Sequence, residues 1–185
     1  MNEKKNLTIE ETFALAVQNH KKNNLQVAEN LYKKILKTNP NHFDSIFYLG
    51  TLLAQTKRFD LAKPLIQKAI QINPDYTGAY NNLGNIQREL GEHKKAMSSF
   101  EKAIQIQPNY ANAYYNLGNI LQELWELQKA KSCYEKLLNL DPTYKKGYSG
   151  YGNLLLKITQ HSKGLAYIRK GDGVIRFTQK DVKII

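Results

Sequence analysis

Hydrophobic and small residues recur along the chain with the spacing of one face of an α-helix. Tyr80, Leu83, Gly84 and Gln87 stand at positions i, i+3, i+4 and i+7, so they share one helical face. Similar segments follow one another with short polar breaks between them. The pattern predicts an all-α chain of consecutive helix pairs.

Prolines divide this pattern into units of equal length. Four of the five prolines stand at a constant interval along the chain, at Pro40, Pro74, Pro108 and Pro142. Each follows a helical run, which it cannot extend, and forces the residue before it out of the α region. We therefore expect a leader of residues 1–8, four units, a degenerate fifth unit and a non-repeat tail. The units are 9–42, 43–76, 77–110, 111–144 and 145–170, and the tail is 171–185.

Two columns of small residues appear when the units are aligned on this period. Small residues on two facing helices allow their backbones to approach closely, so we expect tight contact within each pair. Bulky columns lie between them, including Tyr32, Ile66, Phe100, Tyr134 and Ile168 on the second helices. The first small column is Ala16, Gly50, Gly84, Gly118 and Gly152, and the second is Ala28, Ala62, Ala96, Ala130 and Gly164.

The turn inside each unit is less uniform in sequence. Gly91 and Asn23 suit the left-handed residue that ends many helices. Lys57 and Trp125 occupy the same place in other units, where a positive φ costs more. We expect those two turns to be built differently.

These features resemble the tetratricopeptide-repeat (TPR) family over residues 9–144, and more loosely to about residue 170. Residues 80–86 (YNNLGNI) and 114–120 (YYNLGNI) are similar to the superhelical repeats of O-GlcNAc transferase. The resemblance implies a right-handed superhelical α-solenoid of antiparallel helix pairs, whose first helices line the concave side. It also implies that asparagines on those helices hold a peptide.

Asparagines are concentrated on the expected groove face of the first helices. An asparagine amide can bond both the C=O and the N–H of an extended peptide without reading its sequence. Stacked units would place Asn85, Asn119 and Asn153 in one row and Asn82 and Asn116 in another. The alternative is that these amides bond to neighbouring helices. The predicted peptide-binding residues are Asn81, Asn82, Asn85, Asn112, Tyr115, Asn116, Asn119, Asn153, Phe47 and Tyr48.

The sequence favours a protein-interaction scaffold over an enzyme. Its four histidines are far apart, no metal-binding spacing is present, and the lone Cys133 has no partner for an internal disulfide. We therefore expect no catalytic residue, metal, cofactor or small-molecule substrate. The positions that would grip the carboxylates of chaperone C-termini hold no cation, so such tails are not predicted partners. An alternative function is the N-terminal substrate-recruiting module of a larger enzyme, a glycosyltransferase or an oxygenase.

Charge and hydropathy limit the classes of partner and the compartment that we expect for the protein. The net charge is +11, and residues 145–185 contribute nine basic against two acidic residues. Nucleic acid is nevertheless disfavoured as a partner, because no RNA-binding motif or aromatic-lined basic groove accompanies this charge. No apolar run approaches the ~18 residues of a membrane span, and no secretory signal is evident. We expect a cytoplasmic protein.

The repeat pattern ends after Gly171. Residues 174–177 and 182–185 are rich in β-branched residues and have no helical period. The tail could fold back over the fifth unit as a cap, or the chain could continue into a further segment. An uncapped C-terminal end would also leave self-association open.

Overall fold

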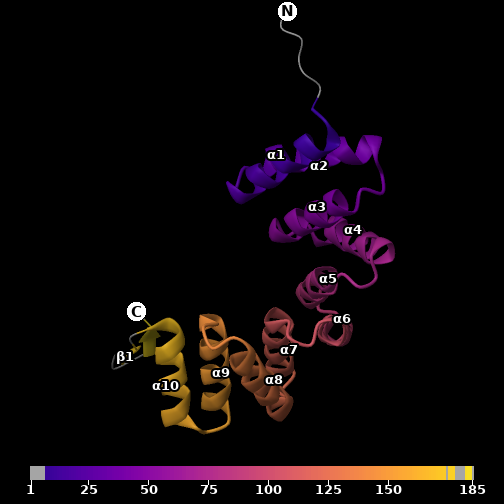
Figure 1. Cartoon of the computed structure of the whole chain (residues 1–185). Helices are drawn as coiled ribbons and strands as arrows, with labels where there is room; N and C mark the ends of the chain where they lie inside the picture. Colours follow the sequence, from indigo (N-terminus) through magenta and orange to yellow (C-terminus); the bar gives the residue numbers. More distant parts are fainter. Residues whose placement is uncertain (1–6, 174, 178–181, 185) are drawn as a thin grey trace, which may run out of the picture. The chain divides into compact units, whose positions relative to one another are not determined.

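The computed structural model describes residues 7–173, 175–177 and 182–184, which form helices followed by two short paired strands (Figure 1). As the sequence predicts, the fold is an all-α solenoid of helix pairs, and its handedness stays a prediction. The helices are α1 (Ile9–Lys21), α2 (Leu25–Thr38), α3 (Phe43–Gln55), α4 (Phe59–Ile72), α5 (Thr77–Glu89), α6 (His93–Ile106), α7 (Ala111–Glu123), α8 (Leu127–Leu140), α9 (Lys145–Lys157) and α10 (His161–Asp172).

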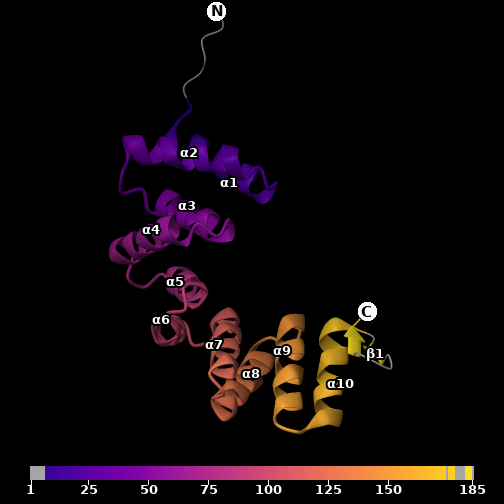
Figure 2. The ribbon, with the colours of Figure 1, turned by 180° about the vertical axis from the view of Figure 1, so that it is seen from behind.

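The chain divides into two compact units, Met1–Glu92 and His93–Ile185. Helices that follow one another pack side by side within each unit, as Figure 1 and Figure 2 show from opposite sides. In the first unit, α1 packs on α2 and α3 on α4. In the second unit, α7 packs on α8 and α9 on α10. Each unit therefore contains stacked helix pairs.

The helix boundaries repeat with the period of the prolines. First helices begin at Ile9, Phe43, Thr77, Ala111 and Lys145, at the same constant interval. Asn39, Asn73 and Asp141 end the second helices in extended conformations, with φ near −131°, −132° and −136°. A proline follows each of them, so the extended backbone agrees with the predicted stop signal.

The side chains of these same residues hold the turns between pairs. The backbone N–H of Asn41 donates to Asn39 Oδ1 (3.3 Å), and that of Thr143 donates to Asp141 Oδ1 (2.9 Å). Such Asx turns compete with helix and fix a change of chain direction. Each proline turn is therefore shaped by the residue before it as well as by the ring.

The prediction that Lys57 and Trp125 belong to a different kind of turn is wrong. Both adopt positive φ (60° each), as do Asn23 (62°), Gly91 (73°) and Thr159 (64°). The helix end closes alike each time: Arg58 N–H donates to Leu53 O (2.9 Å), as Glu126 N–H does to Leu121 O (2.8 Å). These hydrogen bonds satisfy the last carbonyls of the helix and offset the cost of a left-handed side-chain residue, about 1–2 kcal/mol.

The backbones of two paired helices meet directly where the small columns face each other in α9–α10. Every described member of both columns is buried, as predicted. In the pair α9–α10, a Cβ added to Gly152 would lie 2.7 Å from the carbonyl oxygen of Gly164. A Cβ on Gly164 would lie 2.9 Å from the carbonyl oxygen of Gly152. Because backbone is on both sides, neither contact can be relieved by moving a side chain.

The bulky column of the second helices forms the core between pairs. Tyr32, Ile66, Phe100 and Tyr134 are fully buried and Ile168 is nearly so. Burial of side chains this large supplies much of the stability of a stacked helical fold. The prediction of a space-filling second-helix position is confirmed.

An ion pair between the buried carboxylate of Glu29 and exposed cations joins two successive helix pairs in the first unit. The Arg58 guanidinium donates two hydrogen bonds to the Glu29 carboxylate, from Nη1 to Oε1 at 3.1 Å and from Nη2 to Oε2 at 2.6 Å. Lys33 Nζ lies 2.6 Å from Glu29 Oε1. Lys63 and Glu92, at the equivalent positions one repeat further on, form a similar pair with the charges exchanged (2.7 Å). The Arg58 hydrogen bonds lower the pKa of Glu29 to about 2, against an opposing effect of burial.

Two short strands near the C-terminus pair as an antiparallel sheet. β1 (Ile175–Phe177) pairs with β2 (Val182–Ile184), and Arg176 lies opposite Lys183. α10 ends at Asp172, just beyond the predicted limit of the fifth unit at residue 170. The remaining parts of the predicted tail, residues 174, 178–181 and 185, lie outside the described residues, as do residues 1–6 of the leader. The choice between a cap and a further segment stays open.

The common left-handed turn predicts opposite effects for two reciprocal substitutions. Lys57→Gly should raise the free energy of unfolding by about 0.5–1 kcal/mol, because glycine adopts positive φ without steric cost. Gly91→Lys should lower it by about 1 kcal/mol for the converse reason. Urea unfolding followed by circular dichroism measures both changes. A less stable Lys57→Gly variant would contradict this account of the turns.

The Glu29 ion pair predicts a pH-dependent stability. Because the pKa of Glu29 is about 2 in the fold and 4.5 otherwise, its contribution is complete above pH 4.5 and is lost as the pH falls toward 2. Glu29→Gln should cost on the order of 2 kcal/mol at pH 7. Its deficit relative to wild type should shrink below pH 4.5. Urea midpoints measured from pH 7 to pH 3 test this, with Glu101→Gln, an exposed carboxylate without an ion pair among the described residues, as control.

Candidate functional site

Pockets open on the faces of the first helices in both units. In the first unit, one pocket of about 300 Å³ lies between α1 and α3, and another of about 400 Å³ lies between α3 and α5. Thr51 and Gln55 of α3 line both, so the two pockets adjoin. In the second unit, a pocket of about 270 Å³ lies between α7 and α9. First helices thus line a recessed surface within each unit.

Three of the predicted asparagines use half of their amide inside the protein. Asn82 Nδ2 donates to Thr51 Oγ1 of the neighbouring first helix (2.9 Å). Asn119 Oδ1 accepts from the Tyr134 hydroxyl (2.6 Å), and Asn112 Oδ1 accepts from the Tyr144 hydroxyl (2.8 Å). The alternative interpretation, hydrogen bonding to neighbouring helices, therefore holds for one end of each amide. The other end of each can still bond a ligand.

Two predicted asparagines make no hydrogen bond to the part of the chain that the structure describes. Asn85 is half-buried and lines the α3–α5 pocket together with Asn82. Asn153 is exposed and lines the α7–α9 pocket together with Asn119. These two side chains offer both a donor and an acceptor to a ligand.

Two predicted contact residues are core residues instead. Asn81 is only 7% exposed and Phe47 only 9%. The Phe47 ring packs edge-on against Tyr76 and Tyr48, at centroid distances of 4.8 and 5.5 Å. Residues 47 and 81 are equivalent in the repeat and lie where the groove face meets the packed face. Both side chains are buried, so neither is presented to a ligand.

The other predicted residues are partly accessible. Tyr48 is half-buried and lines the α1–α3 pocket, whereas Tyr115 is half-buried and lines the α7–α9 pocket. Asn112 is exposed at the start of α7. Asn116 is half-buried and already interacts with another part of the chain.

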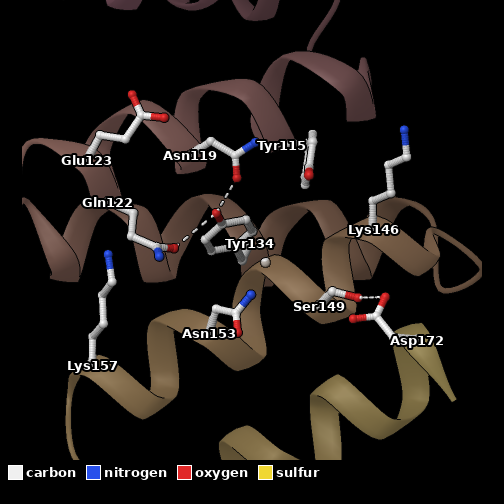
Figure 3. A pocket seen from close by; sticks show the side chains of 11 residues that line it. Tyr115, Asn119, Gln122, Glu123, Tyr134, Lys146, Ser149, Asn153, Lys157 and Asp172 are labelled. Atoms are coloured by element: carbon white, nitrogen blue, oxygen red, sulfur yellow. Dashed lines mark hydrogen bonds between the residues drawn. The ribbon is translucent and has the colours of Figure 1, made fainter. Parts of the chain in front are cut away.

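The α7–α9 pocket is organised around a buried tyrosine (Figure 3). Tyr134 comes from α8, and Gly150 of α9 makes room for it, since a Cβ there would lie 2.9 Å from its ring. Burial raises the pKa of Tyr134 well above its usual value, so the hydroxyl keeps its proton. It donates to Asn119 Oδ1 and approaches Gln122 Oε1 at 3.3 Å. Both amide oxygens therefore turn toward the tyrosine.

Of the α9 residues that line this pocket, only Asn153 was predicted from the sequence. Lys146, Ser149, Gly150, Asn153 and Lys157 follow the helical spacing i, i+3, i+4, i+7 and i+11, and all of them line the pocket. That periodicity was a readable signal in the fifth repeat. Asp172 ends α10 and accepts a hydrogen bond from the Ser149 hydroxyl. It lies beyond the repeat pattern, so the alignment of the units could not predict its place in the pocket.

The described residues contain neither a metal-binding cluster of side chains nor an ionised cysteine. No three His, Cys, Asp or Glu side chains among them lie close enough to hold a metal ion. Burial raises the pKa of the Cys133 thiol to about 11, so it is not a thiolate at neutral pH. None of the described helices combines the length and apolar character needed to cross a bilayer.

Sequence comparison finds the same repeat in several overlapping windows. Models described as tetratricopeptide repeat match residues 21–77, 65–97 and 111–144. A model described as TPR repeat matches residues 84–124. No curated protein sequence matches the chain. The likeness to the repeats of O-GlcNAc transferase stays a prediction.

Solved structures share the fold. The crystal structure of MamA is 24% identical and superimposes with a TM-score of 0.74 over 88% of this chain and 89% of MamA. A thermophilic TPR protein of Thermus thermophilus is 22% identical, with a TM-score of 0.74 over 89% of this chain and 90% of that protein. YrrB, described as a TPR protein with an unusual peptide-binding site, is 19% identical, with a TM-score of 0.68 over 89% of this chain and 84% of YrrB.

The matched windows together span residues 21–144, and the helix pairs continue at the same interval on both sides of that span. The chain is a tetratricopeptide-repeat protein.

Proposed function

We propose that the chain is a protein-interaction scaffold that holds an extended peptide against its first helices. One observation carries the proposal: pockets on the first-helix faces of both units contain asparagine amides with hydrogen-bonding capacity left over. Asn82 and Asn85 provide it between α3 and α5, and Asn119 and Asn153 provide it between α7 and α9.

The chemistry of these amides suits a peptide backbone. An extended peptide presents a C=O and an N–H at every residue, and an amide side chain can bond either. The internal hydrogen bond of Asn119 fixes the orientation of its amide, so less conformational entropy is lost when a ligand binds. Asn85 and Asn153 lack such a bond among the described residues and supply both a donor and an acceptor. Recognition of this kind reads the backbone more than the sequence.

Apolar surface in the same pockets adds affinity. Ala54 and Phe59 line the α3–α5 pocket, and Val17, Leu25 and Tyr48 line the α1–α3 pocket. Each net hydrogen bond contributes about 0.5–1.5 kcal/mol, and a desolvated aromatic contact contributes a similar amount.

A protein of similar fold supports the proposal of peptide binding. YrrB, which has a similar fold, is described as having a peptide-binding site. At 19% identity the likeness concerns the fold, so the argument for this chain rests on its own pocket residues.

Removing the two unengaged asparagines should weaken peptide binding without disturbing the fold. Peptides selected from a displayed library of random twelve-residue sequences serve as ligands. Asn85→Ala combined with Asn153→Ala should raise the Kd of such peptides about three- to tenfold, since each pocket loses an amide that can make one or two hydrogen bonds. Fluorescence anisotropy measures the Kd, and circular dichroism confirms the helical content.

Gln67→Ala combined with Asn139→Ala is the matched control. These exposed amides lie on the second helices α4 and α8, so their loss should leave the Kd unchanged. Unchanged affinity in the folded Asn85/Asn153 variant, or equal losses in both variants, would rule out the proposed site.

A further inference from the structure

We infer that the α7–α9 pocket selects a peptide segment that carries two acidic side chains about five residues apart. This inference rests on the proposed function and names the class of partner that one of its pockets takes. It follows from the donors in the pocket, from the placement of two lysines on α9, and from the charge around them.

Hydrogen-bond donors predominate among the groups that Tyr134 orients. The Tyr134 hydroxyl donates its one proton to Asn119 Oδ1 at 2.6 Å. The NH₂ group of Asn119 therefore remains for a ligand, and the amide of Gln122 lies beside it in the pocket. Asn153 adds a further amide on the facing helix, as Figure 3 shows. Oxygen acceptors, such as peptide carbonyls and carboxylates, match this set.

Two ammonium groups lie toward opposite ends of the same pocket (Figure 3). Lys146 and Lys157 are both exposed, and neither has an acidic partner within 4 Å in the described part of the chain. Lys157 Nζ lies 5.4 Å from the centre of the Trp125 ring, a contact that steadies the side chain without neutralising its charge. Two cations that form no ion pair in the described part of the chain thus flank the amide donors.

The separation of the lysines sets the spacing of the ligand. Eleven residues along an α-helix correspond to three turns and about 16 Å, so both side chains leave the same face of α9. An extended peptide advances about 3.3 Å per residue. A peptide that runs along α9 therefore meets the two ammonium groups with side chains about five residues apart.

The surrounding charge favours an acidic partner. Residues 93–173 contain 12 Lys and Arg against 6 Asp and Glu. Complementary charge increases the rate of association and discriminates against basic competitors. In the first unit, the α3–α5 pocket is lined by a single lysine, Lys57, together with Glu89.

Two carboxylates also line the pocket and oppose an acidic ligand. Glu123 is exposed on α7, and Asp172 lies at the end of α10. Asp172 accepts a hydrogen bond from Ser149, which lies one helical turn from Lys146. The chain therefore places one of its own carboxylates where an acidic side chain of the ligand would bind, and the two compete.

Synthetic peptides test the inference directly. The probe is a twelve-residue Ser/Ala peptide with Glu at positions 4 and 9, acetylated and amidated so that only side-chain carboxylates are present. Its twin carries Gln at both positions. Wild type should bind the Glu peptide about tenfold more tightly in 50 mM salt, and this preference should shrink in 500 mM salt. Equal affinities for the two peptides would overturn the inference.

Two charge-matched variants locate the preference. Lys146→Gln combined with Lys157→Gln should abolish the difference between the peptides. Lys136→Gln combined with Lys163→Gln removes the same charge from exposed positions on α8 and α10. This variant should retain most of the difference in affinity between the two peptides. Equal loss in both variants would mean that net charge, not the pocket, is responsible, which also overturns the inference.

Asp172→Asn gives an independent prediction in the opposite direction. Removing this carboxylate should tighten binding of the Glu peptide two- to fivefold and leave binding of the Gln peptide unchanged. Weaker binding of the Glu peptide by the folded variant would contradict the inference.

The two proposals can fail separately. If the random library yields peptides that depend on Asn85 and Asn153 but carry no excess of acidic residues, the scaffold function stands and acid selectivity is refuted. If neither the library nor the Glu peptide binds, both proposals fall.

Discussion

The fit of each first helix against the second helix of its pair, at the small residues, is the constraint on which the other features depend. Small residues occupy both sides of that contact throughout the repeat, and in α9–α10 a single added Cβ would meet a carbonyl oxygen at 2.7 Å. Because neither helix can slide or rotate there without a clash, the remaining faces have fixed directions. One face buries the large side chains, such as Tyr134, and the face beyond it lines the pockets.

The same constraint explains how the pocket amides are held. Tyr134 fills the space left by Gly118 and Gly150, and its hydroxyl reaches Asn119 at the pocket floor. Asn82 is held by Thr51 on the adjacent first helix. Each of these amides therefore forms an internal hydrogen bond with one of its polar groups and presents the other group to the pocket. The two interpretations of the asparagines, structural and ligand-binding, describe opposite ends of one side chain.

The repeat could be predicted from the sequence because its determinants are local. Prolines, small residues and helical spacing each act within a few residues. The turns at Lys57 and Trp125 could not be predicted from residue preference, because hydrogen bonds that close the helix outweigh the cost of a left-handed side chain. Asn81 and Phe47 lie at the border between two faces, where burial depends on neighbours such as Tyr76. Asp172 enters its pocket from outside the repeat pattern.

The central claim is that first helices, not second helices, receive the peptide. The most direct measurement follows the side-chain NH₂ resonances of asparagines by NMR during titration with a library-selected peptide. The account predicts shifts at Asn85, Asn119 and Asn153, while Asn30 and Asn139 on the exposed second-helix surface stay in place. Shifts confined to the second-helix asparagines, with those of the first helices unmoved, would contradict it.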